Sequence, residues 1–299
     1  MERDDRSPGV AGYLILRPRI TPWGYLVRFA VKKTLGFAAA MALLAILLVA
    51  IFANVAAPQD PYKANYRNTL NAPSPRFLMG TDHLGRDVLS RIIYGARISM
   101  IVGFSAVGAA LIAGSVWGLA SGYFGGKVDL IIQRIMDSIL ALPLLIAAMV
   151  IVAIFGGSLF NVVIAIAFGM QARINRVVRA AVISIRENAY MEAAKAIGAR
   201  DLRILQRYVL PNIMAPIIVI ASVDLGAAIL QEASLSFLGL GIPPPEPSWG
   251  GMLSSEGRQY FERAPWLAIF PGIVLSITVL AFNLFGDSIR DVLDPRLRT

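Results

Sequence analysis

Four polar side chains set in apolar stretches are the residues most able to act chemically inside a membrane. Asp224, Gln231 and Glu232 share one stretch, and Asn283 lies in another. Ionisable groups in lipid are costly and usually face a cavity or a partner. Asp224 and Gln231 are seven residues apart and therefore fall on one helical face. These residues are candidates for lining a path through the membrane. The alternative is that they hydrogen-bond to neighbouring helices or lie near the membrane interfaces.

The chain offers little for bond-making catalysis. It has no cysteine and a single histidine, His83, which excludes disulfides, thiol nucleophiles and a His-cluster metal site. Gly126-Lys127 is followed by Val128, and position 121 is Ser121, so this stretch is not the G-x-x-x-x-G-K-[ST] loop that binds ATP. We expect no catalytic residue, metal or cofactor in this chain. An intramembrane hydrolase would need a nucleophile paired with a base, and none is evident.

Residues 192–212 form a polar, Arg-rich segment between two strongly apolar ones. Ala193 and Ala194 offer a flat helical face that another surface can approach closely. Glu192 and Lys195 are three residues apart and could pair on the same helix. The alternative is an ordinary basic amphipathic helix lying on anionic lipid.

The residues that follow predict a turn in this segment. Gly198 should end the first helix, because glycine adopts positive φ at no steric cost. Asp201 is expected to cap a second short helix over residues 202–208. Pro211 would stop that helix or open the next one. The expected shape is a helix–turn–helix that projects from the membrane.

Membrane-spanning helices must position these residues. Hydrophobic residues make up 57% of the chain and charged residues 16%. Apolar runs recur at about 20 residues, the length that crosses a bilayer as a helix. We therefore predict an all-α integral membrane protein with about six spans, at residues 35–57, 98–123, 138–155, 160–171, 213–240 and 266–285.

The predicted organisation places a leader at residues 1–34, a transmembrane domain at 35–287 that includes a cytoplasmic segment at 172–211, and a tail at 288–299. With the N-terminus inside, 20 Lys and Arg residues lie on the inner side and eight on the outer side. This bias puts both termini in the cytoplasm. It also explains the net charge of +9 without nucleic acid. The first span exceeds a signal-peptide core, so we expect an uncleaved anchor.

Two stretches are expected on the outer face. Residues 79–100 carry apolar residues at helical spacing, and Asp82 is expected to cap the helix. Residues 241–251, GIPPPEPSWGG, form a loop that its prolines stiffen. Each stretch either packs on the bundle or receives a partner.

The spacing of Glu192-Ala193-Ala194, Gly198 and Leu210-Pro211 resembles the EAA motif of ABC importer permeases. Tyr208 departs from that pattern, which favours isoleucine. Further stretches are similar to the dipeptide/oligopeptide/nickel permease family, most of all to its C-type subunit: residues 79–100, 134–143, 231–253 and 285–298.

The resemblance implies a type I ABC importer permease fold and a cytoplasmic coupling helix that docks into an ATPase. The contact residues that it implies are Glu192, Ala193, Ala194, Gly198, Leu210 and Pro211. The implied partners are a second, B-type permease subunit, two cytoplasmic ATPase subunits that bind ATP and Mg, an extracytoplasmic substrate-binding protein and membrane lipid.

The implied location is the bacterial cytoplasmic (inner) membrane, and the implied substrates are di- or oligopeptides, with nickel or glutathione as alternatives. A gradient-driven secondary transporter would fit broken helices and midplane charges. It would leave the EAA segment unexplained.

Overall fold

The computed structural model describes residues 33–293, except the side chains of residues 255 and 256. Most of the expected leader and the last residues of the expected tail (1–32 and 294–299) lie outside this range. The described chain consists of helices and loops, with one isolated β-bridge between Thr81 and Asp87. Its long helices are α2 (Thr34–Ile51), α4 (Val88–Phe124), α7 (Leu159–Arg186), α10 (Leu210–Phe237) and α13 (Trp266–Leu293).

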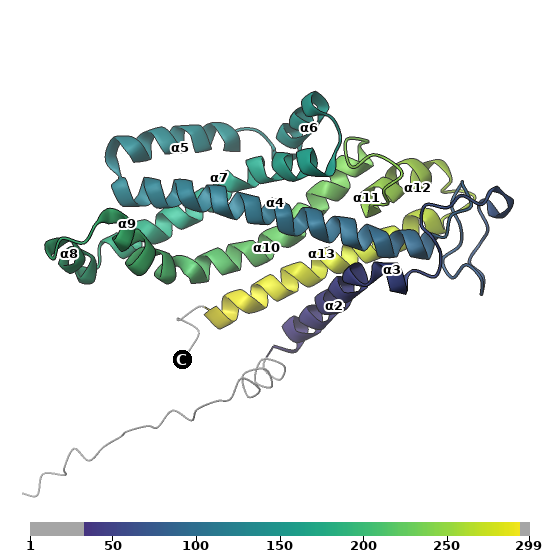
Figure 1. Ribbon diagram of the computed structural model, residues 1–299, viewed down its shortest axis with the longest axis horizontal. Coiled ribbons are helices and arrows are strands. Elements are labelled where there is room, and N and C mark those ends of the chain that lie inside the picture. Colours follow the sequence, from purple (N-terminus) through teal and green to yellow (C-terminus); the bar gives the residue numbers. More distant parts are fainter. Residues whose placement is uncertain (1–32, 294–299) are drawn as a thin grey trace, which may run out of the picture.

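Shorter elements connect the long helices. They are α3 (Ala53–Ala56), η1 (Tyr66–Asn68), α5 (Gly126–Leu140), α6 (Leu144–Phe155), α8 (Ala189–Ala196), α9 (Asp201–Ile204), η2 (Leu205–Val209), α11 (Trp249–Gly251), η3 (Met252–Glu256) and α12 (Gly257–Gln259). The helices α4, α7, α10 and α13 run along the long axis of the molecule (Figure 1). The short helices α8 and α9 lie at one end of the molecule, which we call the α8 end. The helices α11 and α12 and the loop before α4 lie at the other, the α12 end.

The prediction of an all-α protein with apolar spans is confirmed. Within the described residues, four helices are long and apolar enough to cross a membrane: Thr34–Ile51, Val88–Phe124, Asp201–Phe237 and Trp266–Leu293. The pair α5 and α6 adds a fifth span if it is counted as one, although it bends by 85°. Pro143 explains this break within expected span 138–155, because proline cannot donate a backbone hydrogen bond and disfavours helix in the residue before it.

The expected span at residues 160–171 is the apolar first half of the longer helix α7. The second half of α7 carries Arg173, Arg176, Arg179 and Arg186, and α7 is not among the four apolar helices. At the other side of the polar segment, α9 and η2 continue into α10 as one helical stretch. The expected segment 172–211 is therefore built largely from extensions of two long helices, and α8 lies between them.

Small residues allow α4 and α7 to pack closely. A Cβ atom built on Gly114 would lie 2.8 Å from the Cβ of Ile174, and one on Gly118 would lie 2.7 Å from the Cβ of Val178. The facing Ile174 and Val178 are fully buried. Helices associate in lipid by this kind of close contact. These glycines therefore mark a helix–helix face.

We predict that Gly118→Ala destabilises the bundle, because the added methyl group would force α4 away from Val178. Overpacking of this kind costs about 1–3 kcal/mol. The midpoint of thermal unfolding in detergent should fall. The matched control is Gly108→Ala on the same helix, where the new Cβ would meet no atom within 4 Å. Equal unfolding midpoints for the two variants would contradict the proposed packing.

Candidate functional site

The helix α8 is attached to the bundle by one face and exposed on the other. Met191 and Ala194 are 1% and 3% exposed and belong to the main hydrophobic core. Glu192 and Ala193, the first two residues of the predicted contact set, are exposed. Lys195 is also exposed, and its ammonium lies over the ring of Tyr123. The helix α8 therefore exposes Glu192 and Ala193 on the surface of the molecule, while Met191 and Ala194 attach it to the core.

The turn after α8 forms as predicted at Gly198. Its φ is +77°, and its backbone N–H donates to the carbonyl of Lys195 at 2.9 Å. The N–H of Ala199 donates to the carbonyl of Ala194 at 3.1 Å, which completes a helix end of the type that glycine favours. Gly198 itself is exposed.

The expectation that Asp201 caps the next helix is wrong. Asp201 is the first residue of α9, and no side-chain bond caps this helix. Its carboxylate instead accepts a hydrogen bond from the hydroxyl of Tyr123 at 2.6 Å. The spacing of residues along the chain suggests a local cap, but Tyr123, distant in the sequence, binds this carboxylate instead.

Tyr123, at the end of α4, is a residue that the sequence reasoning missed. Its ring contacts Lys195 of α8 at 5.6 Å, and its hydroxyl binds Asp201 of α9. Arg186, at the end of α7, donates to the carbonyls of Gly122 and Tyr123. The available signal was a tyrosine at the end of a predicted apolar span. Tyr123 therefore ties both short helices of the polar segment to α4.

Apolar side chains are exposed at the same end. Ile197 is 80% exposed and Leu202 is 65% exposed, although both lie in a basic segment. We call Glu192, Ala193, Ile197 and Leu202 the tip surface. Figure 1 shows α8 and α9 at the extreme end of the molecule, far from α12.

The last two predicted contact residues begin α10. Leu210 is partly buried and packs against the main core, whereas Pro211 is exposed as the second residue of the helix. Tyr208, which departs from the EAA pattern, is also partly buried against this core. Its side chain therefore helps to fix the base of the segment.

The arginines of α7 bind carboxylates on neighbouring helices. Arg179 lies in a part of α7 beyond the apolar spans and makes two bonds of 2.6 Å to Asp129 of α5. These hydrogen bonds to the carboxylate hold the pKa of the Arg179 guanidinium above its ordinary value. Arg176 of α7 donates a hydrogen bond to Asp137, also on α5, at 2.8 Å. These pairs hold α5 against α7.

The four candidate path residues lie in different environments. Asp224, near the middle of α10, is fully buried, with Arg173 of α7 at 3.1 Å. Glu232 is also fully buried, and its carboxylate accepts hydrogen bonds from Ser236 at 2.8 Å and from Ser99 at 3.3 Å.

Gln231 is partly buried, and Asn283 is exposed on α13 near Gly226. Glu232 therefore has hydrogen-bond partners inside the fold, whereas Asp224 contacts Arg173 and Asn283 is exposed. Among residues 33–293, no group of three His, Asp or Glu side chains could hold a metal ion.

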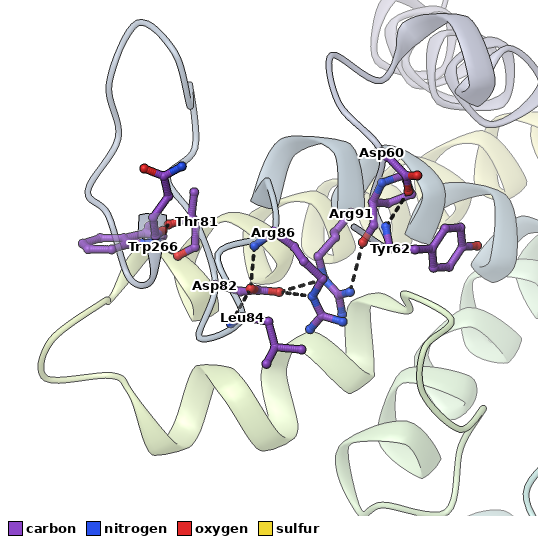
Figure 2. Close-up of polar contacts among 10 residues, drawn as sticks. Asp60, Tyr62, Thr81, Asp82, Leu84, Arg86, Arg91 and Trp266 are labelled. Atoms are coloured by element: carbon purple, nitrogen blue, oxygen red, sulfur yellow. Dashed lines mark hydrogen bonds and ion pairs between the residues drawn. The ribbon is translucent and has the colours of Figure 1, made fainter. Parts of the chain in front are cut away.

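At the α12 end, the loop before α4 is organised by Asp82 (Figure 2). One carboxylate oxygen of Asp82 accepts from the backbone N–H groups of Leu84 and Arg86 at 2.8 and 2.9 Å. The other accepts from Nε of Arg86 at 2.6 Å, with Nε of Arg91 at 3.5 Å. Arg91 also donates to the carbonyl of Pro61 at 3.4 Å. The predicted capping role of Asp82 is wrong, because α4 begins at Val88.

The side chain that caps α4 is Asp87, which accepts from the N–H of Ser90. Trp266, at the start of α13, donates from Nε1 to the carbonyl of Thr81 at 3.2 Å and joins this loop to the bundle (Figure 2). The loop before α4 is therefore held by the bonds of Asp82 within it and by the bond from Trp266 of α13.

A cavity of about 550 Å³ lies between this loop and the segment after α10. Arg86, Arg91 and Glu246 contribute charged side chains to its lining. Glu246, in the proline-rich loop, accepts a hydrogen bond at 2.9 Å from Tyr62. Burial and this bond raise the pKa of Tyr62 to about 12, so its hydroxyl keeps its proton to well above neutral pH. The two predicted outer stretches therefore meet at one surface.

Residues 110–299 match a protein family described as binding-protein-dependent transport system inner membrane component. The chain is 44% identical to a dipeptide transport system permease protein, DppC, of Alkalihalophilus pseudofirmus, over 94% of this chain and 92% of that protein. It is 46% identical to a di/tripeptide transport system permease protein, DppC, of Pseudomonas aeruginosa, over 86% of each.

A third relative is a glutathione transport system permease protein, GsiD, of Pectobacterium atrosepticum, 40% identical over 93% of each chain. The fold is similar to a chain of the MetNI methionine ABC transporter solved in an inward-facing conformation. The TM-score is 0.56 at 18% sequence identity, covering 69% of this chain and 97% of that one.

We predict that Tyr123→Phe loosens the polar segment, because it removes the hydrogen bond to Asp201 while keeping the ring beneath Lys195. A hydrogen bond of this kind contributes about 0.5–1.5 kcal/mol, which corresponds to a roughly two- to tenfold change in an opening equilibrium. Tryptic cleavage after Lys195, Arg200 and Arg203 should accelerate by this factor in detergent. The control is Tyr66→Phe, in an exposed loop at the α12 end. Unchanged cleavage in Tyr123→Phe would contradict the anchoring role.

Proposed function

Because this chain belongs to the family of binding-protein-dependent transport system inner membrane components, we propose that it is one of two permease subunits of an ATP-driven importer of short peptides. It is a multi-pass permease subunit of an ABC transporter in the inner membrane. Its role is to form part of the path for the substrate and to transmit motion from the ATPases. It carries out no bond chemistry itself.

The observation that carries the proposal is the tip surface. Ile197 and Leu202 are largely exposed, while Met191 and Ala194 anchor the same segment in the core. Apolar residues exposed together at a rigid, protruding end are typical of a surface that binds another protein. The partner that fits is a cytoplasmic ATPase subunit, since the stretch at Gly126-Lys127 lacks the ATP-binding loop. Two ATPase subunits would bind ATP and Mg.

The orientation follows from the excess of Lys and Arg on the side of the α8 end. Both termini and α8 would then be cytoplasmic, and the α12 end would face outward. There, Tyr62 and Glu246 join the two loops beside the cavity of about 550 Å³. We assign this face to the substrate-binding protein. The second permease subunit would complete the path.

The cycle starts when the loaded binding protein docks on the outer face. ATP binding closes the two ATPases and moves the tip surface. Because α7 and α10 continue directly into the segment that bears it, this motion turns the long helices and opens the path outward. Hydrolysis resets the inward-facing state. A glutathione importer is the second candidate, because one relative with 93% coverage is a glutathione permease.

We predict that Glu192→Lys uncouples ATP hydrolysis from transport. Like charges brought together at a protein interface cost several kcal/mol, so uptake should fall at least about tenfold while the protein still inserts. Replacing Gly198, whose φ is +77°, by leucine should act in the same direction. The measurement is binding-protein-stimulated ATP hydrolysis and peptide uptake by the complete transporter in vesicles.

The matched control is Glu187→Lys, an equal charge change at an exposed residue that precedes α8. It should keep most of the uptake. Normal uptake in both Glu192→Lys and Gly198→Leu would rule out the coupling role of this segment.

We further predict that deletion of the gene abolishes uptake of a labelled di- or tripeptide, and that the wild-type gene restores it. Unlabelled peptides should compete, whereas excess glutathione or nickel ions should not. Accumulation of nickel should be unchanged by the deletion. Peptide uptake that survives deletion, together with loss of glutathione uptake, would favour the second candidate.

A further inference from the structure

A groove of about 570 Å³ opens between α7, α10 and α13 in the half of the bundle toward the α8 end. Its volume is in the range of sites for small ligands. Pro216 and Val223 of α10 contribute to its wall, and Asp287 and Arg290 of α13 lie near its end. Arg173 of α7 lines the groove at the level of the middle of α10. The groove thus extends from the bundle interior to the proposed cytoplasmic end.

The contact between Arg173 and Asp224 differs from the other arginine pairs of α7. Asp224 is fully buried, whereas the side chain of Arg173 is 58% exposed. Their closest atoms are 3.1 Å apart, yet within residues 33–293 neither carboxylate oxygen of Asp224 receives a hydrogen bond. In contrast, Arg179 binds Asp129 through two nitrogens.

This geometry leaves donors of Arg173 facing the groove. A guanidinium carries five N–H donors in a planar fork that matches a carboxylate. The carboxylate of Asp224 attracts one nitrogen of the Arg173 guanidinium electrostatically. Because Asp224 is buried, this contact fixes the position of the arginine. An incompletely hydrogen-bonded buried carboxylate is costly and calls for an explanation. Here the reason would be that Asp224 orients Arg173 without occupying its fork.

We propose that Arg173, positioned by Asp224, binds the C-terminal carboxylate of a peptide during its passage through the groove. This inference rests on the proposed function, since it requires a peptide substrate. Arg290 supplies a second cation closer to the cytoplasmic end, partly balanced by Asp287. Arg173 is the residue that contacts the substrate, and Asp224 is a positioning residue.

The test compares a tripeptide that has a free carboxylate with its C-terminal amide. Uptake of each is measured in vesicles that contain both permease subunits and the ATPases, at concentrations that saturate the binding protein. The binding protein contributes the same factor to every permease variant. A change in the ratio of acid to amide uptake therefore reports on the permease. We expect Arg173→Gln to lower this ratio at least about fivefold, through reduced uptake of the acid.

The matched control is Arg176→Gln, on the same helix and equally exposed, whose partner is Asp137 rather than a groove residue. Its ratio should equal that of the wild type. The double variant Arg173→Gln/Asp224→Asn leaves no unpaired buried charge and should show the same lowered ratio if the single variant fails to insert.

An unchanged ratio in the Arg173 variants, or an equal loss of acid and amide uptake, would overturn the carboxylate site and leave a structural ion pair. Absence of uptake of both tripeptides by the wild-type transporter would overturn the proposed function, and the carboxylate site with it.

Discussion

The pairing of the α7 arginines is the interaction on which the rest of the fold depends. A charged side chain that packs against neighbouring helices is stabilised by an opposite charge beside it. The carboxylates of Asp129 and Asp137 on α5 and of Asp224 on α10 meet this need. Another face of α7 packs tightly against the glycines of α4. One helix therefore fixes the positions of three others.

The polar segment between α7 and α10 is held in place by these same helices. The helix α7 runs directly up to α8, and α9 continues into α10, so the segment is the shared end of two long helices. Tyr123 adds α4 through its contacts with Lys195 and Asp201. A displacement of the tip surface therefore acts on three helices together. Chains of packed side chains and rigid helices of this kind carry energetic coupling between distant sites.

The opposite end uses the same principle on a smaller scale. Asp82 is buried with Arg86 and Arg91, and its backbone and side-chain bonds shape the loop before α4 (Figure 2). Trp266 joins that loop to α13. Because the charges are satisfied internally, the loop is a defined surface beside the cavity of about 550 Å³. The two ends thus present different surfaces on a common frame.

Features that depend on local pattern could be predicted from the amino-acid sequence. Apolar length placed the spans at residues 213–240 and 266–285, where the structure has α10 and α13, and Gly198 marked a turn because only its own backbone conformation was at issue. The extent of α7 does not follow from apolar length, because its second half carries arginines, whose charge predicts a loop and whose partners lie on other helices.

The pairing of charges could not be predicted from the sequence, because it depends on how the helices pack. The spacing predicted local caps at Asp82 and Asp201, but the carboxylate of Asp82 binds Arg86 within the loop. The carboxylate of Asp201 binds Tyr123, which is distant in the sequence. Asp224 could be recognised as an unusual residue in an apolar helix, whereas its contact with Arg173 could not. Spacing along the chain fixes which residues share a helical face, but the packing of separate helices fixes which faces touch.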